Sequence, residues 1–184
     1  MTQAPQTTQD QAADLRDRLE IFDLVNSFGL HADARRWDDL QQLLADPIHV
    51  DYTSLSAGEP VTTSPAELVN GWRAGLGGLQ ATQHLIANHQ IALDGHRATC
   101  TAYVQATHVL PNASGGPIWT VAGRYDFALH RSPDAWRIAG LTLTVQWATG
   151  NQQIMQLAAS QATPSYPATT PSPATRRHLH PDHP

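Results

Sequence analysis

The stretch Ala98-Thr-Cys-Thr-Ala-Tyr-Val-Gln-Ala-Thr-His-Val-Leu110 alternates between two kinds of side chain along its whole length. One set is small or apolar and includes His108, whereas the other is mostly threonine, tyrosine and glutamine. A period of two is typical of a β-strand with one face against the core, and a shift by one residue would exchange the two faces. We therefore expect a long strand whose small inward side chains leave room for a cavity beside His108.

Similar alternation continues on both sides of this strand. From Thr82 onward the runs are separated by turn signals at Asp94-Gly95, Pro111 to Pro117 and Ser132 to Asp134, which predicts four consecutive strands joined as hairpins. The run from Gln83 to Leu93 is less decisive. One of its faces is typical of core, so we expect this set to be buried: Leu85, Ala87, His89, Ile91 and Leu93. His84 then shares the opposite face with Asn88 and Gln90, which is either a pocket wall or solvent.

The first third of the chain has helical spacing instead. Apolar residues recur at steps of three and four from Leu15 through Leu19, Phe22 and Val25 to Phe28, which predicts a helix of about 18 residues. A short second helix starts near Trp37 and ends before Pro47, because proline disfavours helical geometry in the residue before it.

Three further elements follow from local signals. Ile48, Val50 and Tyr52 alternate with polar residues, as in a half-buried strand. Ser64-Pro65-Ala66-Glu67 has the features of a helix start, with Ser64 as N-cap, Pro65 in the first turn and Glu67 completing a capping box. Residues 150–160 are expected to add a last short helix.

Helices followed by an antiparallel meander indicate an α+β domain in which a curved sheet wraps around the N-terminal helices. We expect one domain over residues 10–160, since the length and the 41% hydrophobic content suit a single core. Both ends, residues 1–9 and the Pro-, Ser-, Thr- and His-rich residues 161–184, are expected to be disordered tails.

The composition of the chain excludes some classes of binding partner. The net charge is -5 and no cluster of Lys or Arg interleaves with aromatics, so we expect neither nucleic acid nor membrane as a partner but a hydrophobic small molecule. The single cysteine, Cys100, excludes an intramolecular disulfide and is expected to be a small buried hydrophobe. No leader or membrane-spanning run is visible, so a cytoplasmic location is expected.

Four groups capable of acid–base chemistry arrive among apolar neighbours: Asp33, Tyr52, His84 and His108. A histidine is a suitable base for a proton next to a carbonyl, and a carboxylate on its other nitrogen fixes its tautomer. A tyrosine can donate a hydrogen bond to the oxygen where enolate charge develops. The sequence does not decide which histidine would pair with Asp33.

Several short motifs, taken in order, resemble one family. They are Asp33-x-Arg-Arg-Trp-Asp38, Asp51-Tyr52, Thr82-Gln-His-Leu-Ile-Ala-Asn88, Asp94-Gly95-x-x-Ala98, Tyr103-x-x-x-x-His108, Gly123-Arg-Tyr125 and Trp136-Arg-Ile138. The chain is similar over about residues 10 to 155 to SnoaL-like members of the nuclear transport factor 2-like superfamily, near the scytalone dehydratase branch.

That resemblance implies a cone of α+β structure with a deep pocket between helices and sheet. It also implies an Asp-His dyad without a metal, carried over as Asp33 at the end of the first helix and His84 in a strand, with His108 and Tyr52 nearby. Ala32 departs from the pattern, because scytalone dehydratase has a second tyrosine there. This difference puts that enzyme's own substrate in doubt for this chain.

The function expected is a cofactor-independent lyase, a dehydratase acting on a cyclic hydroxyketone. A cyclase or isomerase of natural-product or steroid-like metabolism is the alternative, because the same proton transfer can close a ring or move a double bond. A non-catalytic ligand-binding module and a two-histidine, one-carboxylate metal site built from Asp33, His84 and His108 are further readings. The resemblance also implies a homo-oligomer, a dimer or trimer.

Overall fold

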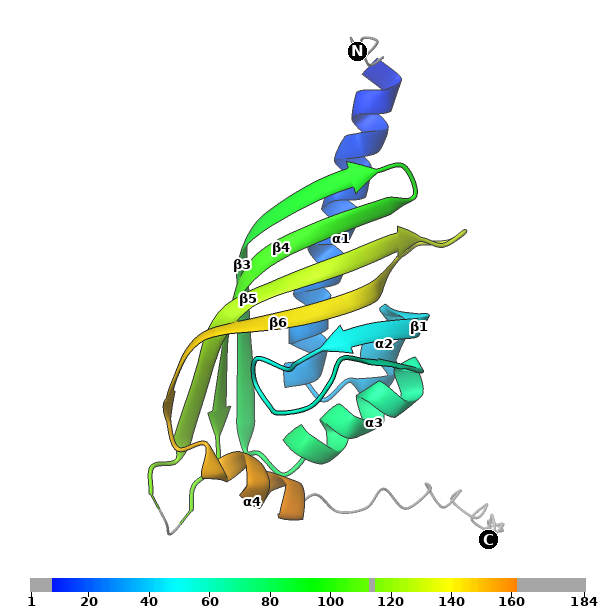
Figure 1. The fold of residues 1–184 in the computed structure, drawn as a ribbon. Helices are drawn as coiled ribbons and strands as arrows, with labels where there is room; N and C mark the ends of the chain where they lie inside the picture. Colours follow the sequence, from blue (N-terminus) through cyan, green and yellow to red (C-terminus); the bar gives the residue numbers. More distant parts are fainter. Residues whose placement is uncertain (1–7, 113–114, 162–184) are drawn as a thin grey trace, which may run out of the picture.

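The structure is a computed structural model, and it describes residues 8–112 and 115–161. Within these residues the chain forms four helices and six strands, and four of the strands are consecutive (Figure 1). Their bounds are α1 Thr8–Asp33, α2 Trp37–Gln42, β1 Leu44–Asp51, β2 Val61–Thr63, α3 Pro65–Leu76, β3 Ala81–Asp94, β4 Arg97–Val109, β5 Ile118–Arg131, β6 Trp136–Gly150 and α4 Gln153–Gln161.

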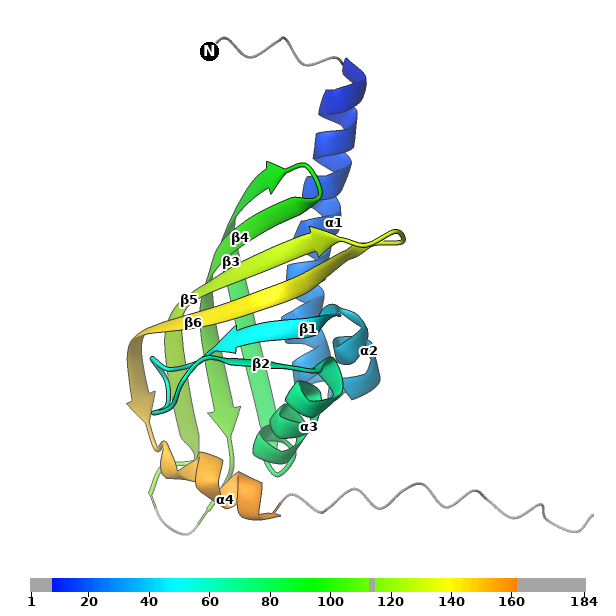
Figure 2. The same ribbon diagram turned by 45° about the vertical axis from the view of Figure 1, so that its right-hand side comes forward.

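The strands form one open, mixed sheet in the order β2-β1-β6-β5-β4-β3. All neighbouring strands run antiparallel except β1 and β6, which are parallel, so β3 to β6 are the expected meander of hairpins. Figure 2 shows the short strand β2 beside β1 at one edge of the sheet. The expected α+β class with a curved sheet and N-terminal helices is therefore confirmed.

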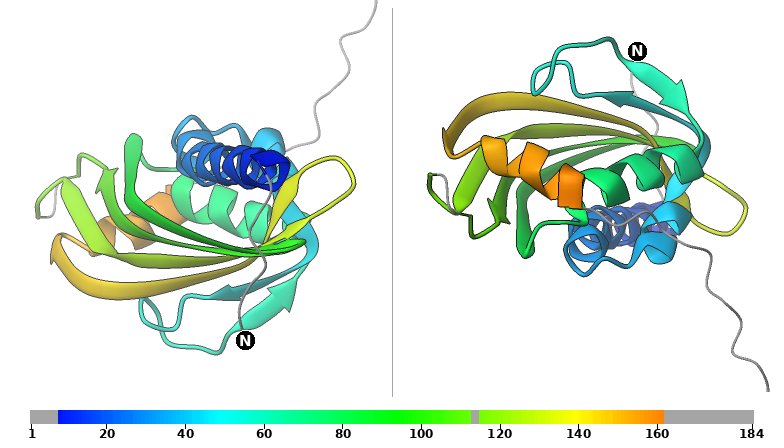
Figure 3. Two further views of the ribbon diagram at one scale, coloured as in Figure 1. Left: turned by 90° about the horizontal axis from the view of Figure 1, so that it is seen from above. Right: turned by 90° about the horizontal axis from the view of Figure 1, so that it is seen from below.

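The long strands bend, and α1, α3 and α4 all lie on the same side of the sheet (Figure 3). This side holds the main core, where Phe28 of α1 meets Phe127 of β5 edge to face with ring centroids 5.8 Å apart. A smaller apolar cluster joins α4 to the ends of β4 and β5 through Ile154, Trp119 and Leu110. Leu55 and Val145 pack against both clusters, and residues of both, Phe28 and Trp119 among them, line one cavity.

Helix α1 begins at Thr8, two residues inside the stretch expected to be a tail. The first half of its predicted apolar stripe is not buried, since Leu15 and Leu19 are more than half exposed. The buried face includes Ile21, Val25 and Phe28. The first turns of α1 extend beyond the sheet (Figure 1), but at Arg18 the helix is already beside β3, because the Arg18 guanidinium donates to the Ile91 carbonyl oxygen at 2.7 Å. With about 3.6 residues per turn, Leu15 and Leu19 lie on a different face of α1 from Ile21, Val25 and Phe28.

Helix α3 starts as predicted. The Ser64 hydroxyl accepts a hydrogen bond from the Glu67 backbone N–H at 3.3 Å, and the Glu67 carboxylate accepts one from the Ser64 backbone N–H at 3.3 Å. This reciprocal capping box satisfies two backbone donors at the helix start. The expected last helix is present as α4.

Strand β3 contains a feature that the sequence analysis missed. Its pairing with β4 shifts between Ala87 and Gln90, and Asn88 has a positive φ of 61°. Such a bulge exchanges the two faces of a strand, so His84 and Ile86 before it and Ile91 after it all point toward the helices. The expectation that Leu85 and Ala87 face the core is therefore wrong, and Leu85 is 54% exposed.

The expected tails fall mostly outside the described residues, which exclude 1–7, 113–114 and 162–184. None of the helices within the described ranges is long and apolar enough to cross a membrane. Cys100 is fully buried in β4, as expected of a small core residue.

Candidate active site

The end of α1 and the start of β3 place a carboxylate against an imidazole. Asp33 is the last residue of α1, and its Oδ1 lies 2.7 Å from Nδ1 of His84. Its other oxygen, Oδ2, accepts a hydrogen bond from the His84 backbone N–H at 2.7 Å, and the Thr82 hydroxyl donates to Oδ1 at 2.9 Å. His84 is therefore the histidine that pairs with Asp33.

These contacts fix the protonation of the pair. Burial alone would raise the pKa of Asp33, but the hydrogen bonds from His84 and Thr82 outweigh it and hold the pKa below its ordinary value. An ionised carboxylate only accepts hydrogen bonds, so Nδ1 of His84 must carry the proton. The free lone pair of His84 is then on Nε2, and the side chain is only 10% exposed.

Arg35 was not among the candidate residues, yet it supports the dyad. Its guanidinium donates to the Thr82 hydroxyl at 2.9 Å and to the backbone carbonyl of Ala32 at 3.1 Å. Arg35 has a positive φ of 58°, which turns the chain back after α1 and brings its side chain toward β3. The arginine thus orients the threonine that in turn orients the Asp33 carboxylate.

His108 lies on β4 and is only 4% exposed. Its ring stacks on that of Trp119 with centroids 5.1 Å apart, and it meets the His84 ring edge to face at 6.1 Å. Burial, reinforced by the nearby charge that His84 can carry, lowers the pKa of His108 to about 4, so the side chain is neutral at neutral pH. Its Nδ1 lies 3.4 Å from the Trp119 carbonyl oxygen, which can only accept, so Nε2 of His108 is unprotonated.

Two tyrosines stand together across from the dyad. Tyr52 follows β1 directly, and its hydroxyl is within hydrogen-bonding reach of Tyr125 on β5 and of the Trp72 indole on α3. Burial raises the pKa of both tyrosines well above the ordinary value, so both hydroxyls keep their protons.

Trp72 can only donate, so the Tyr52 oxygen accepts from it and the Tyr52 hydroxyl donates to Tyr125. This order leaves the proton of the Tyr125 hydroxyl free for another acceptor. The sequence analysis did not select Tyr125 as a site residue. Its position in the apolar alternation of β5, two residues before Phe127, was the signal that could have found it.

These groups surround an apolar cavity of about 130 Å³. An apolar cavity of roughly 150 Å³ accommodates a molecule the size of benzene, so this one suits a single ring. The four candidates from sequence behave differently here, because His84, His108 and Tyr52 line the cavity whereas Asp33 lies behind His84. The remaining lining residues are Phe28, Ala32, Leu55, Trp72, Leu76, Ala106, Trp119, Val121, Tyr125, Leu143 and Met155.

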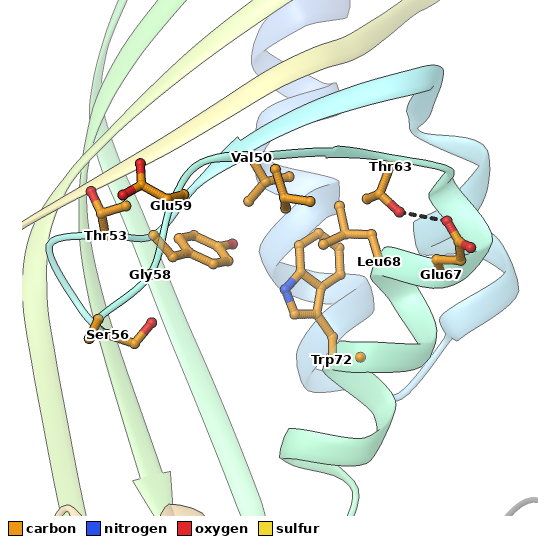
Figure 4. Close-up of a pocket in the computed structure, with 13 residues that line it drawn as sticks. Val50, Thr53, Ser56, Gly58, Glu59, Thr63, Glu67, Leu68 and Trp72 are labelled. Atoms are coloured by element: carbon orange, nitrogen blue, oxygen red, sulfur yellow. Dashed lines mark hydrogen bonds between the residues drawn. The ribbon is translucent and has the colours of Figure 1, made fainter.

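A second cavity of about 300 Å³ has two lining residues in common with the first, Tyr52 and Trp72. Figure 4 shows it between α3 and the loop that leads from β1 to β2. Trp72 projects into it from the helix, while Thr53, Ser56 and Glu59 lie on the loop opposite. We call these two spaces the inner and the outer cavity.

The arrangement does not suit the metal site considered from sequence. The Asp33 carboxylate is engaged by His84 and Thr82 and lies behind His84, so it does not face the cavity beside the two histidines. Throughout residues 8–112 and 115–161, no group of three or more His, Cys, Asp and Glu side chains could hold a metal ion.

Comparison with known proteins agrees with the fold. Residues 13–142 match the family described as the SnoaL-like domain. The crystal structure of the Kfla4162 protein of Kribbella flavida is 32% identical, with a TM-score of 0.73, and the match covers 79% of this chain and 98% of that one.

Two more distant structures share the fold. A protein of Novosphingobium aromaticivorans named as a candidate scytalone dehydratase is 17% identical with a TM-score of 0.63, over 79% of this chain and 93% of that one. A hexachlorocyclohexane dehydrochlorinase, LinA-type3 of Novosphingobium barchaimii, is 16% identical with a TM-score of 0.63, over 77% and 94%.

Proposed function

The chain belongs to the SnoaL-like domain family, and from that premise we propose that it is a lyase that removes water from a cyclic hydroxyketone by acid–base catalysis. The observation that carries the proposal is the Asp33–His84 contact of 2.7 Å at the wall of an apolar, ring-sized cavity. The names of the structural neighbours, a candidate scytalone dehydratase and a dehydrochlorinase, support elimination chemistry.

His84 is the base in this proposal. Its Nε2 carries the free lone pair, and Asp33 stabilises the imidazolium that forms when His84 takes a proton from the carbon next to the substrate carbonyl. Because Asp33 is held by Thr82, and Thr82 by Arg35, the pair needs little rearrangement during the reaction. These residues require no cofactor for this step.

The tyrosine pair supplies the hydrogen bond to the developing enolate. The Tyr125 hydroxyl keeps its proton and has it free, since Tyr52 already donates to its oxygen. We assign the contact with the substrate oxygen to Tyr125, with Tyr52 and Trp72 behind it. The sequence analysis gave that role to Tyr52.

The dyad can supply both proton transfers of the reaction. The C–H bond breaks to His84, the C–O bond to the hydroxyl breaks, a C=C bond forms, and the His84 imidazolium returns its proton to the departing hydroxide as water. His108 is neutral at neutral pH, so we assign to its Nε2 the acceptance of a hydrogen bond from the substrate rather than the proton donation considered from sequence.

An isomerase is the second candidate, and one observation favours it. With His108 neutral, His84 is the only imidazole of the cavity paired with a carboxylate, so one group must both remove and return the proton. A double-bond shift needs only that single shuttle. Product mass separates the two reactions, because only dehydration lowers it by one water.

Turnover of 3-hydroxycyclohexanone, a single-ring hydroxyketone, tests the proposal. We expect the purified protein to form cyclohexenone and water, detected by mass and by enone absorbance. We expect His84→Ala and Asp33→Asn to lower the rate by about 100-fold or more, the usual size of a lost general base.

His89→Ala is the matched control, because His89 lies on the same strand but packs on Phe22 and does not line the cavity. It should keep wild-type turnover. Dyad variants that turn over as fast as the wild type would overturn the assignment. Conversion of cyclohex-3-enone to cyclohex-2-enone, with no dehydration of 3-hydroxycyclohexanone, would favour the isomerase.

A further inference from the structure

The inner cavity, at about 130 Å³, is too small for anything beyond one ring. It shares the side chains of Tyr52 and Trp72 with the outer cavity, which is larger at about 300 Å³. A molecule longer than one ring, with its first ring against His84, would therefore extend past these two side chains into the outer cavity.

A glycine, which has no side chain, lines the outer cavity on its helical side. Gly71 lies on the wall formed by α3, and a Cβ placed on it would have no heavy atom within 4 Å. Glycine in the middle of a helix costs about 1 kcal/mol relative to alanine. The helix thus carries an unfavourable residue at a position that lines the cavity.

The side chains that line the outer cavity suit an uncharged, largely apolar group. Val50, Val61, Leu68 and Trp72 give apolar walls, and the hydroxyls of Thr53 and Ser56 lie on the loop side. Glu59 and Glu67 also line it, and the described lining residues include no Lys, Arg or His. Hydrogen bonds from Thr63 and Ser64 lower the pKa of Glu67, so that side chain is a carboxylate. An anionic group would be repelled there.

We propose that the outer cavity is a second compartment of the substrate site, which binds an uncharged extension, such as a second ring, of a molecule whose first ring occupies the inner cavity. The inference rests on the proposed function for the placement of the first ring. The substrate class is thus a two-part, uncharged ring ketone. Gly71 is the residue that keeps the compartment open.

Binding of unreactive ketones tests this without catalysis. Cyclohexanone fills only the inner cavity, whereas 4-phenylcyclohexanone adds a second ring, and neither carries a hydroxyl to eliminate. We expect the second ring to tighten binding by about tenfold or more, measured by titration calorimetry or ligand-observed NMR. A benzoic acid in place of the phenyl group, 4-(4-oxocyclohexyl)benzoic acid, should lose this gain.

Gly71→Leu and Gly75→Leu are matched variants. Both glycines lie on α3 one turn apart and both face open space, but only Gly71 lines the outer cavity. We expect Gly71→Leu to weaken 4-phenylcyclohexanone about tenfold and to leave cyclohexanone within twofold, while Gly75→Leu changes neither. Ala57→Phe, on the loop wall, should act like Gly71→Leu and serves if that variant does not fold.

The outcomes separate the two proposals. Equal effects of Gly71→Leu on both ketones, or no effect on either, would overturn the second compartment. His84→Ala that leaves cyclohexanone binding unchanged would instead count against the placement of the ring, and hence against the proposed function. If Gly71→Leu and Ala57→Phe weaken the binding of 4-phenylcyclohexanone but not that of cyclohexanone, the inference is supported.

Discussion

At the scale of single residues, the tautomer of each histidine in the site is set by a neighbouring group that can only accept a hydrogen bond. Asp33 forces a proton onto Nδ1 of His84, and the Trp119 carbonyl does the same for His108. The two histidines then differ in one respect, because only His84 has a carboxylate to stabilise its charged form. The same residue type therefore serves as a base in one place and as a neutral acceptor 6.1 Å away.

The buried, neutral state of His108 predicts a pH dependence of stability. An unfolded histidine takes up a proton near its ordinary pKa of 6.5, whereas burial holds the pKa of folded His108 to about 4. Between these values the unfolded chain binds more protons, so stability is present above pH 6.5 and is lost as the pH falls. This one group should account for about 3 kcal/mol of that loss.

Chemical denaturation of the wild type and of His108→Phe at several pH values between 7 and 4 measures this contribution. Phenylalanine keeps a ring against Trp119 but cannot take up a proton. The free energy of unfolding of the variant should therefore fall about 3 kcal/mol less than that of the wild type over the window. Parallel curves would show that His108 titrates in the folded protein as it does in the unfolded chain.

The sequence predicted some site residues better than others. The alternation in β4 placed His108 on the inner face without further help, and the structure agrees. Asp33 and His84 were selected chiefly by family resemblance, and their contact became visible only in the fold. Tyr125 was missed because an apolar-facing tyrosine in a strand has the same pattern as a core residue.

At the scale of elements, the bulge in β3 decides which way His84 points. Without the extra residue near Asn88, the strand could not direct both His84 and Ile91 toward the helices, because they are separated by an odd number of positions. The run Gln83 to Leu93 looked indecisive from sequence for this reason. Strict alternation was assumed through a point where the strand changes face.

Asn88 adopts a left-handed conformation that few side chains tolerate, and this gives a testable consequence. Asn88→Val should destabilise the protein by about 1–2 kcal/mol, since a β-branched residue is strained at this φ. Asn88→Gly should cost much less, because glycine adopts positive φ freely. Asn88 is exposed, so lost packing does not confuse the comparison. Urea denaturation measures both, and equal losses would argue that the bulge does not depend on this residue.

The start of α3 was predicted better than the end of α2, which lies at Gln42 rather than just before Pro47, and better than the buried face of α1. The capping box of α3 is encoded in four adjacent residues and appears as expected. The buried face of α1 depends on how the helix is turned against the sheet, which adjacent residues do not specify. Leu15 and Leu19 continue the apolar spacing but lie on a different face of the helix from Ile21, Val25 and Phe28, and they are exposed.

At the scale of the whole molecule, the site exists because distant segments meet inside one curved sheet. Asp33 and His84 are 51 positions apart in sequence, and Tyr52 follows β1 whereas Tyr125 lies on β5. The α+β class and the meander followed from periodicity, but the parallel pairing of β1 with β6 and the two cavities did not. Cavity volume depends on how side chains from several elements pack, and no pattern within one element reports it.

The central claim is that His84, held by Asp33, removes a proton from the carbon next to a ring carbonyl. Deuterium uptake by cyclohexanone in D₂O, followed by NMR, measures that step directly and requires no knowledge of the true substrate. We expect the wild-type protein to accelerate uptake, His84→Ala to lower the protein-dependent rate by about 100-fold, and His89→Ala to leave it unchanged. An equal protein-dependent rate in His84→Ala and the wild type would contradict the account.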